Sequence, residues 1–188
     1  MNSLRIIGGQ WRRQVIRFPD SAGLRPTPGR VRETLFNWLG QDLSGRACLD
    51  LFAGSGALGF EAASRGAARV VMVEKDARVL RALKENAQRL KMPETVEFVA
   101  ADALEFAVSC ATSFDVLFLD PPYRLGWLAR LEPFLDTLLD AQGDLYAEAE
   151  FPVEALGAWH ATRRKQAGQV YFHVLERRQK IEASESVF

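Results

Sequence analysis

Four residues whose types and order suggest chemistry, Asp120, Pro121, Pro122 and Tyr123, directly follow the apolar run 116–119. A buried strand that ends in this way predicts a rigid polar loop at its carboxyl end, where open α/β sheets collect their ligands. Proline fixes φ and carries no N–H, so the loop would offer mainly acceptors. Asp120 and the Pro121 carbonyl could accept the two hydrogens of an exocyclic amino group, while Tyr123 stacks on the ring. The alternative is a turn that merely ends a strand, because Asp and Pro are common in turns.

A glycine-rich segment lies upstream of this loop. Residues 50–59, Asp-Leu-Phe-Ala-Gly-Ser-Gly-Ala-Leu-Gly, follow the apolar residues 47–49 and precede a helical pattern. The spacing of Gly54, Gly56 and Gly59 therefore has the strand–turn–helix context of a nucleotide-binding loop. Glycine lets the backbone approach a ligand and lets the helix pack closely on the strand. The segment predicts cofactor contacts from Asp50, Phe52, Ala53, Gly54, Ser55, Gly56 and Gly59.

Acidic residues follow four successive predicted strands. Asp50 and Asp120 are two of them, Glu74 comes 20 residues after Gly54, and Asp102 follows residues 96–100. Glu74 could accept hydrogen bonds from both hydroxyls of a ribose, and Asp102 could reach the amino group of an adenine. Lys75 and Ala103, which follow these two acids, complete the predicted cofactor site.

The charge of Asp50 separates the possible cofactors. A carboxylate there would repel the pyrophosphate that NAD lays on a helix N-terminus. The same carboxylate suits the ammonium and sulfonium charges of S-adenosylmethionine. No Gly-Lys-Ser/Thr sequence follows the glycines, which excludes a phosphate-binding P-loop. Together with the four ordered acids, the pattern predicts a methyltransferase that acts on an amino group.

The chain also resembles a known family. Residues 5–12, 24–27 and 30–39 precede the glycine loop and the Asp-Pro-Pro-Tyr loop in one fixed order. This order resembles the bacterial 16S ribosomal RNA guanine-N2 methyltransferases of the RsmD type, from about Arg5 to residues 168–170. The resemblance implies S-adenosylmethionine as methyl donor, S-adenosylhomocysteine as product, and a guanine of small-subunit ribosomal RNA, free or in the assembled subunit, as acceptor.

Charge is distributed unevenly along a chain whose formal net charge is zero. Residues 1–46 carry a net charge of +5, residues 47–160 carry −8, and residues 161–188 carry +3. A basic N-terminal arm could track RNA phosphates and supply affinity without base specificity. The alternative is ordinary solvated surface charge. The arginines predicted to contact RNA are Arg5, Arg12, Arg13, Arg17, Arg25, Arg30 and Arg32.

The order of predicted elements indicates an α/β fold. Residues 4–7 and 15–18 predict an N-terminal β-hairpin. Thr27 as N-cap, followed by Pro28, predicts the start of a helix whose apolar stripe is Val31, Leu35, Trp38 and Leu39. Strands predicted at 47–52, 69–74, 96–100, 115–120 and 144–149 alternate with helical patterns such as 77–90, which indicates a parallel sheet covered on both faces. Residues 162–165 and 170–175 predict a late hairpin that adds an antiparallel strand.

The family resemblance makes this expectation more definite. It implies a Rossmann-like class I methyltransferase fold, with a mostly parallel seven-stranded sheet, helices on both faces and the small N-terminal β-hairpin. We expect one domain over residues 1–188, divided into a basic arm (1–23), a catalytic core (24–176) and a tail (177–188). The last residues, 182–188, are expected to fray.

Bulk composition agrees with a cytoplasmic enzyme. The chain has 188 residues, of which 48% are hydrophobic, enough for one domain with a full core. It contains no apolar run long enough to span a membrane and no apolar segment typical of a secretory signal. Cys48 and Cys110 lack metal-ligand spacing, so we expect free thiols, no bound metal and a reducing compartment. His160 and His173 are expected to be structural, and the protein to be a monomer.

Other functions remain open at this point. An adenine-N6 methyltransferase acting on DNA or RNA would use the same two loops, although only 65 residues follow Tyr123 to supply a base-reading segment. A protein glutamine methyltransferase would not need the basic arm. An NAD oxidoreductase or a non-catalytic RNA-binding module could carry the glycine loop but would not explain Asp-Pro-Pro-Tyr.

Overall fold

A central sheet organises the computed structural model, which describes residues 1–21 and 24–178. Its strand order is β5-β4-β3-β6-β7-β10-β9-β8. The strands from β5 to β7 are parallel, and those from β7 to β8 are antiparallel. The strands are β3 (Ala47–Asp50), β4 (Arg69–Glu74), β5 (Val96–Ala100), β6 (Phe114–Leu119), β7 (Leu139–Ala149), β8 (Ala155–Leu156), β9 (Trp159–Ala167) and β10 (Val170–Arg177).

The predicted α/β class is confirmed, with corrections at one edge. All five predicted core strands are present, although β7 begins five residues before the predicted range 144–149. The sheet of the described residues has eight strands, not seven, because the two-residue β8 pairs with β9. The late hairpin, which turns at Gly168, adds two antiparallel strands and not one. The predicted fraying of residues 182–188 lies outside the described residues.

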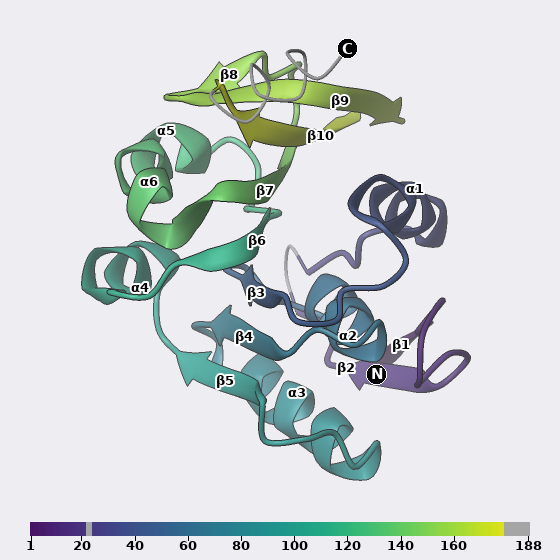
Figure 1. Cartoon of the computed structure of the whole chain (residues 1–188). Helices are drawn as coiled ribbons and strands as arrows, with labels where there is room; N and C mark the ends of the chain where they lie inside the picture. Colours follow the sequence, from purple (N-terminus) through teal and green to yellow (C-terminus); the bar gives the residue numbers. More distant parts are fainter. Residues whose placement is uncertain (22–23, 179–188) are drawn as a thin grey trace.

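Helices cover both faces of the sheet (Figure 1). One face carries α1 (Gly29–Leu39), α2 (Ala57–Ser64) and α3 (Ala77–Arg89); the other carries α4 (Ala103–Ser109), α5 (Trp127–Leu131), the 3₁₀ turn η1 (Glu132–Phe134) and α6 (Leu135–Leu138). Because side chains alternate along a strand, Cys48 of β3 enters the core on the α1–α3 side and Leu49 the core on the α4–α6 side. None of the helices in the described ranges is long and apolar enough to cross a bilayer.

The first helix begins later than predicted. Pro28 occupies the N-cap position of α1, and no side chain caps the helix. Thr27, predicted to be that cap, instead donates its hydroxyl to Asp120 Oδ2 over 3.2 Å. The predicted apolar stripe also needs revision. Phe36 is fully buried, whereas Trp38 is half-buried and stacks on Phe172 of β10 with ring centroids 5.4 Å apart.

The predicted N-terminal hairpin is present, with its first strand two residues earlier than predicted, and it lies against α2 (Figure 1). Its strands, β1 (Asn2–Arg5) and β2 (Val15–Phe18), form a separate two-stranded sheet. The intervening segment approaches α2 so closely that a Cβ on Gly9 would lie 1.7 Å from the Ser64 carbonyl oxygen. Only glycine fits there. The indole N–H of Trp11 donates to the Leu90 carbonyl at 2.9 Å, which fixes the segment to the end of α3.

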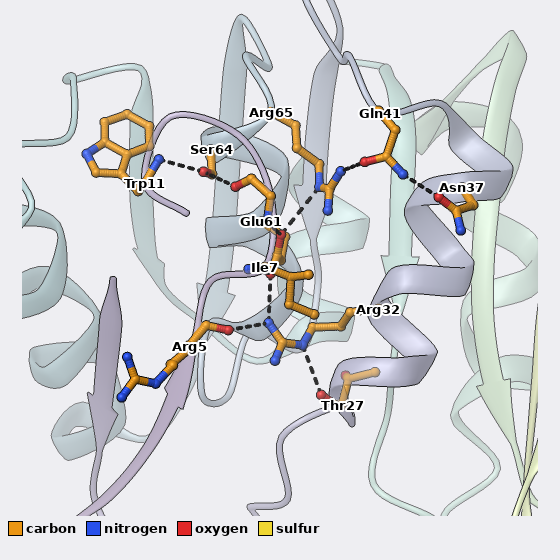
Figure 2. Close-up of polar contacts among 11 residues, drawn as sticks. Arg5, Ile7, Trp11, Thr27, Arg32, Asn37, Gln41, Glu61, Ser64 and Arg65 are labelled. Atoms are coloured by element: carbon orange, nitrogen blue, oxygen red, sulfur yellow. Dashed lines mark hydrogen bonds and ion pairs between the residues drawn. The ribbon is translucent and has the colours of Figure 1, made fainter. Parts of the chain in front are cut away.

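A buried carboxylate on α2 joins the hairpin to α1, as Figure 2 shows. Glu61 Oε1 lies 2.8 Å from Arg32 Nη1 and accepts the Ile7 N–H at 2.6 Å, while Oε2 lies 3.3 Å from Arg65 Nε. Arg32 also donates to the carbonyls of Arg5 and Thr27. The prediction that Arg32 contacts RNA is therefore wrong. Its side chain is 5% exposed and its donors are used inside the protein.

This ion-pair network generates a stability prediction. Glu61→Gln would leave Arg32 and Arg65 buried without a countercharge, and breaking a buried pair typically costs about 3–5 kcal/mol of unfolding free energy. Glu97→Gln is the matched control, because Glu97 pairs with Arg69 at the surface and exposed pairs contribute about 1 kcal/mol or less. Urea denaturation of both variants measures the difference. Equal losses would contradict a structural role for the Glu61 network.

Candidate cofactor and substrate site

The four predicted acids lie along one edge of the sheet. Asp50 and Glu74 are the last residues of β3 and β4, Asp120 directly follows β6, and Asp102 follows β5 by two positions. These strands are neighbours in the order β5-β4-β3-β6 and run parallel, so their carboxyl ends meet at one edge. The chain crosses from one side of β3 to the other between β5 and β6. Ligands of open α/β sheets bind at such a switch point.

The glycine loop follows β3 and leads into α2. A Cβ on Gly59 would lie 2.8 Å from the Met72 side chain, so glycine permits close packing of α2 on β4. Asp50 Oδ2 accepts the Gly59 N–H at 2.9 Å and is 1% exposed. Burial, followed by the charges of Asp120 and Glu74, raises the pKa of Asp50 to about 7. The Asp50 carboxyl therefore ionises near neutral pH.

Glu74 and Asp102 shape the loops beside them. Glu74 accepts the N–H groups of Gly54 and Asp76, one on each carboxylate oxygen, at 3.0 and 2.8 Å. Asp102 is the N-cap of α4 and accepts the Leu104 N–H at 2.9 Å. A carboxylate has about four lone-pair sites, so each acid retains acceptor capacity for a ligand.

The remaining predicted cofactor residues differ in exposure. Lys75 is exposed, and Phe52 is half-buried with its ring edge-on to Trp127, at a centroid distance of 5.1 Å. Ala53, Ser55 and Ala103 are buried. Their side chains pack inside the protein, so any contact they make with a cofactor would have to come from the backbone.

The Asp-Pro-Pro-Tyr loop leaves the sheet beside the glycine loop. Asp120 is half-buried and Pro121 buried, whereas Pro122 and Tyr123 are exposed, Tyr123 with 42% of its surface. The next residue, Arg124, adopts φ 63° and donates its N–H to Glu150 at 3.0 Å. The loop thus presents an aromatic ring at the surface next to a partly covered carboxylate.

Three residues beside Asp120 were not predicted to belong to this site. The Thr27 hydroxyl donates to Asp120, and the buried Tyr146 and Glu148 of β7 are bonded to each other at 2.7 Å through the phenol O–H. Burial raises the pKa of Asp120, of Tyr146 and, together with the charge of Asp120, of Glu148. Tyr146 and Glu148 are two residues apart and therefore share a face of the sheet, but Asp140, Gln142 and Asp144 of the same strand are polar too, so no local signal distinguishes the pair.

The basic residues of the predicted RNA surface, apart from Arg32, are at the surface. Arg5, Arg12, Arg13, Arg17, Arg25 and Arg30 are all exposed. Partial burial, followed by nearby carboxylates, raises the pKa of the Tyr123 phenol above its usual value, and Arg25 is near enough for its positive charge to lower that pKa. Positive charge therefore lies close to the exposed ring.

Comparison with known proteins places the chain in a family. Residues 4–176 match the family described as "Conserved hypothetical protein 95". Ribosomal RNA small subunit methyltransferase D of Escherichia coli K12 is 42% identical over 183 residues, which cover 93% of this chain and 90% of that protein. The solved structure of Escherichia coli yhhF has 40% identity and a TM-score of 0.84, covering 94% of this chain and 98% of that one.

A more distant structure shares the fold alone. The 16S rRNA N2 G1207 methyltransferase (RsmC) of Thermus thermophilus, in complex with AdoMet and guanosine, is 22% identical with a TM-score of 0.68, covering 94% of this chain and 50% of that one. The family match and the Escherichia coli relative go further than the fold, because they extend over nearly the whole chain. The chain therefore belongs to the family of RsmD-type ribosomal RNA methyltransferases.

Proposed function

We propose that this chain transfers a methyl group from S-adenosylmethionine to the exocyclic N2 amine of a guanine in small-subunit ribosomal RNA. The observation that carries the proposal is the placement of Asp120. It is held by Thr27 at the carboxyl edge of the sheet, with the exposed Tyr123 three residues away and the glycine loop beside it. The name of the Escherichia coli relative supports ribosomal RNA as substrate. The resemblance of the N-terminal motifs to those of the RsmD-type guanine-N2 methyltransferases supports guanine as the acceptor base.

The residues around the glycine loop fit S-adenosylmethionine better than NAD. Asp50 and Glu74 concentrate negative charge at the start of α2, where NAD would place its pyrophosphate. The same charge attracts an ammonium and a sulfonium. Glu74 retains acceptor capacity for ribose hydroxyls. When bound, S-adenosylmethionine supplies an activated methyl group on its sulfonium.

The role of the loop follows from the chemistry of the acceptor. The lone pair of a guanine amine is conjugated into the ring, so the nitrogen is a poor nucleophile. Asp120 and the Pro121 carbonyl would accept its two hydrogens and favour a pyramidal nitrogen with its lone pair toward the methyl group. This combines positioning with stabilisation of the positive charge that develops on nitrogen. The amine loses one proton after transfer, either to Asp120 or to water.

The base must leave its stack to reach Asp120. The exposed Tyr123 ring offers a replacement stacking surface, and Arg25 lies close enough to influence it. The exposed arginines of the N-terminal hairpin would hold phosphates without reading bases. Since the hairpin is fixed to α2, which also carries the glycine loop, RNA held by the hairpin has a defined position relative to the cofactor.

The first prediction here concerns cofactor binding and pH. With a pKa near 7, Asp50 is mostly protonated at pH 6 and ionised at pH 7.5. Affinity for S-adenosylmethionine should therefore rise roughly tenfold between pH 5.5 and 7.5 if the charge of Asp50 attracts it. Asp50→Asn keeps an acceptor for the Gly59 N–H but removes the charge, so its affinity should be weaker and nearly constant. Calorimetric titration at several pH values measures the affinity of both proteins. Identical profiles would show that the pH dependence of binding does not come from Asp50.

The second prediction concerns methyl transfer. Asp120→Ala should lower single-turnover formation of N2-methylguanine by about 10²–10³-fold, the scale for deleting one preorganised polar partner. RNA affinity should change far less. Tyr123→Ala should cost about 1–3 kcal/mol, the scale for one stacked base. Tyr123→Phe, which keeps the ring, should be nearly silent.

The assay uses saturating S-adenosylmethionine, small-subunit RNA and mass spectrometry of the product nucleosides. Near-normal turnover by Asp120→Ala would overturn the role of the loop. If the wild-type protein forms N6-methyladenine, the role proposed for the loop would still hold, but guanine would not be the acceptor.

The third prediction concerns RNA binding by the hairpin. Replacing both Arg12 and Arg13 with Ala should weaken RNA binding and reduce the slope of log affinity against log salt by about 1–2 units, since fewer counterions are released. Arg130→Gln is the control, because Arg130 is exposed on α5, which packs on the opposite face of the sheet. Its slope should match the wild type. An unchanged slope in the double variant would assign RNA binding to another surface.

A further inference from the structure

Glu148 is a buried acid that the proposed reaction does not yet use. It belongs to β7, which runs parallel to β6 with Phe118 opposite Tyr146 and Leu119 opposite Ala147. Continuing this register by one residue places Asp120 beside Glu148. Residues opposite each other on parallel neighbours point to the same face, so the two carboxyl groups are adjacent. Glu148 is 4% exposed.

Hydroxyl groups surround the two carboxyls. Tyr146 donates its O–H to Glu148 Oε1 at 2.7 Å. Thr27 donates its O–H to Asp120 Oδ2 at 3.2 Å and lies close enough to the Glu148 carboxyl to lower its pKa by hydrogen bonding, as Tyr146 also does. Among the residues that the structure describes, neither carboxyl forms a salt bridge. A threonine hydroxyl has one hydrogen, so it can donate to only one of them at a time.

The charges around this pair are mostly negative. The groups that act electrostatically on the pair or on its neighbours come from β3, β4, the loop after β6, β7 and the residue after β7. They are Asp50, Glu74, Tyr123, Tyr146 and Glu150. Arg25 acts on Tyr123 from the segment before α1. Burial and the charge of Asp120 raise the pKa of Glu148. Two adjacent carboxyls in such a setting hold one proton between them near neutral pH, and the more buried one retains it.

We propose that Glu148 is a positioning residue for Asp120, which it orients by holding a proton and donating it in a hydrogen bond to Thr27. Thr27 then directs its own O–H onto Asp120 Oδ2, and the second oxygen of Asp120 is left to accept the amine of the base. The negative charge of the pair resides on Asp120. This inference rests on the proposed function, because it assigns Asp120 to the acceptor amine.

Ionisation of Glu148 would disturb this arrangement. Once Glu148 loses its proton at alkaline pH, two carboxylates compete for the single Thr27 hydrogen and repel each other. Asp120 then loses its fixed orientation, and methyl transfer slows. At acid pH Asp120 itself becomes protonated. It then no longer carries the negative charge that stabilises the positive charge developing on the amine nitrogen. The rate of methyl transfer should therefore fall on both sides of a maximum.

Two substitutions at Glu148 separate these effects. Glu148→Gln cannot ionise but can still accept from Tyr146 and donate to Thr27. It should retain nearly the wild-type single-turnover rate at neutral pH and keep the acid decline, but lack the part of the alkaline decline that comes from Glu148. Glu148→Leu has no donor and should be slower by about 10- to 100-fold, the effect of losing one hydrogen bond in a charged network. S-adenosylmethionine affinity should be unchanged in both.

The pH profiles of wild type and Glu148→Gln are compared directly, since ionisation of the guanine itself affects both equally. Superimposable profiles would overturn the proposal, because a purely structural Glu148 does not change the pH dependence. A Glu148→Gln variant as slow as Glu148→Leu would also overturn the proposal. Gln supplies the same donor as a protonated Glu148, so its failure would mean that the active form of Glu148 is the ionised one.

An infrared measurement on the protein without RNA tests the proton separately. The measurement uses Asp50→Asn protein, because Asp50, with a pKa of about 7, would itself be partly protonated at neutral pH. This protein should show the C=O band of a protonated carboxylic acid at neutral pH, and adding Glu148→Gln should remove the band. Glu154→Gln is the control, because Glu154 is 79% exposed, and it should keep the band. A band that survives Glu148→Gln overturns the proposal. If the band behaves as expected but the wild type forms no N2-methylguanine, the proton on Glu148 is supported and the proposed function fails.

Discussion

The Glu61 carboxylate is the point at which three separate parts of the molecule are held together. It is buried on α2, the helix that the glycine loop opens, and it binds Arg32 of α1 and the backbone of the N-terminal hairpin. Arg32 in turn holds the carbonyl of Thr27, whose hydroxyl contacts Asp120. A buried charge tolerates little displacement, because losing a partner exposes it to a large desolvation penalty. The glycine loop, the basic hairpin and the Asp-Pro-Pro-Tyr loop are therefore fixed relative to one another.

The opposite situation holds at the carboxyl edge of the sheet, where negative charges are brought together. Burial raises the pKa values of Asp50, Asp120 and Glu148, and the charge of Asp120 raises those of Asp50 and Glu148 further. This arrangement costs folding free energy at neutral pH, because a buried carboxyl must either take up a proton or carry its charge without full hydration. A cationic cofactor and an amine acceptor would relieve that cost. Strained or repulsive groups that persist in a fold are typical of functional sites.

The contrast between Arg32 and the other arginines has a simple physical cause. Arg12 and Arg13 lie on the outside of a hairpin loop, where guanidinium groups remain hydrated and can meet phosphate. Arg32 points from α1 toward α2 and finds a carboxylate there. The residue type is the same in both cases. What differs is the neighbour supplied by a helix 29 residues away along the chain.

The sequence by itself determined the α/β class, the five core strands, the glycine loop and the four acids at strand ends, because these depend on local periodicity and on turn residues. It also indicated the family, through motifs that are contiguous in the chain. Only the tertiary structure decided that Arg32 is internal, that Thr27 binds Asp120 instead of capping α1, and that Glu148 lies beside Asp120. Each of these depends on which strands and helices become neighbours. Contacts between residues 29, 93 and 28 positions apart, respectively, leave no local signal for periodicity or spacing to detect.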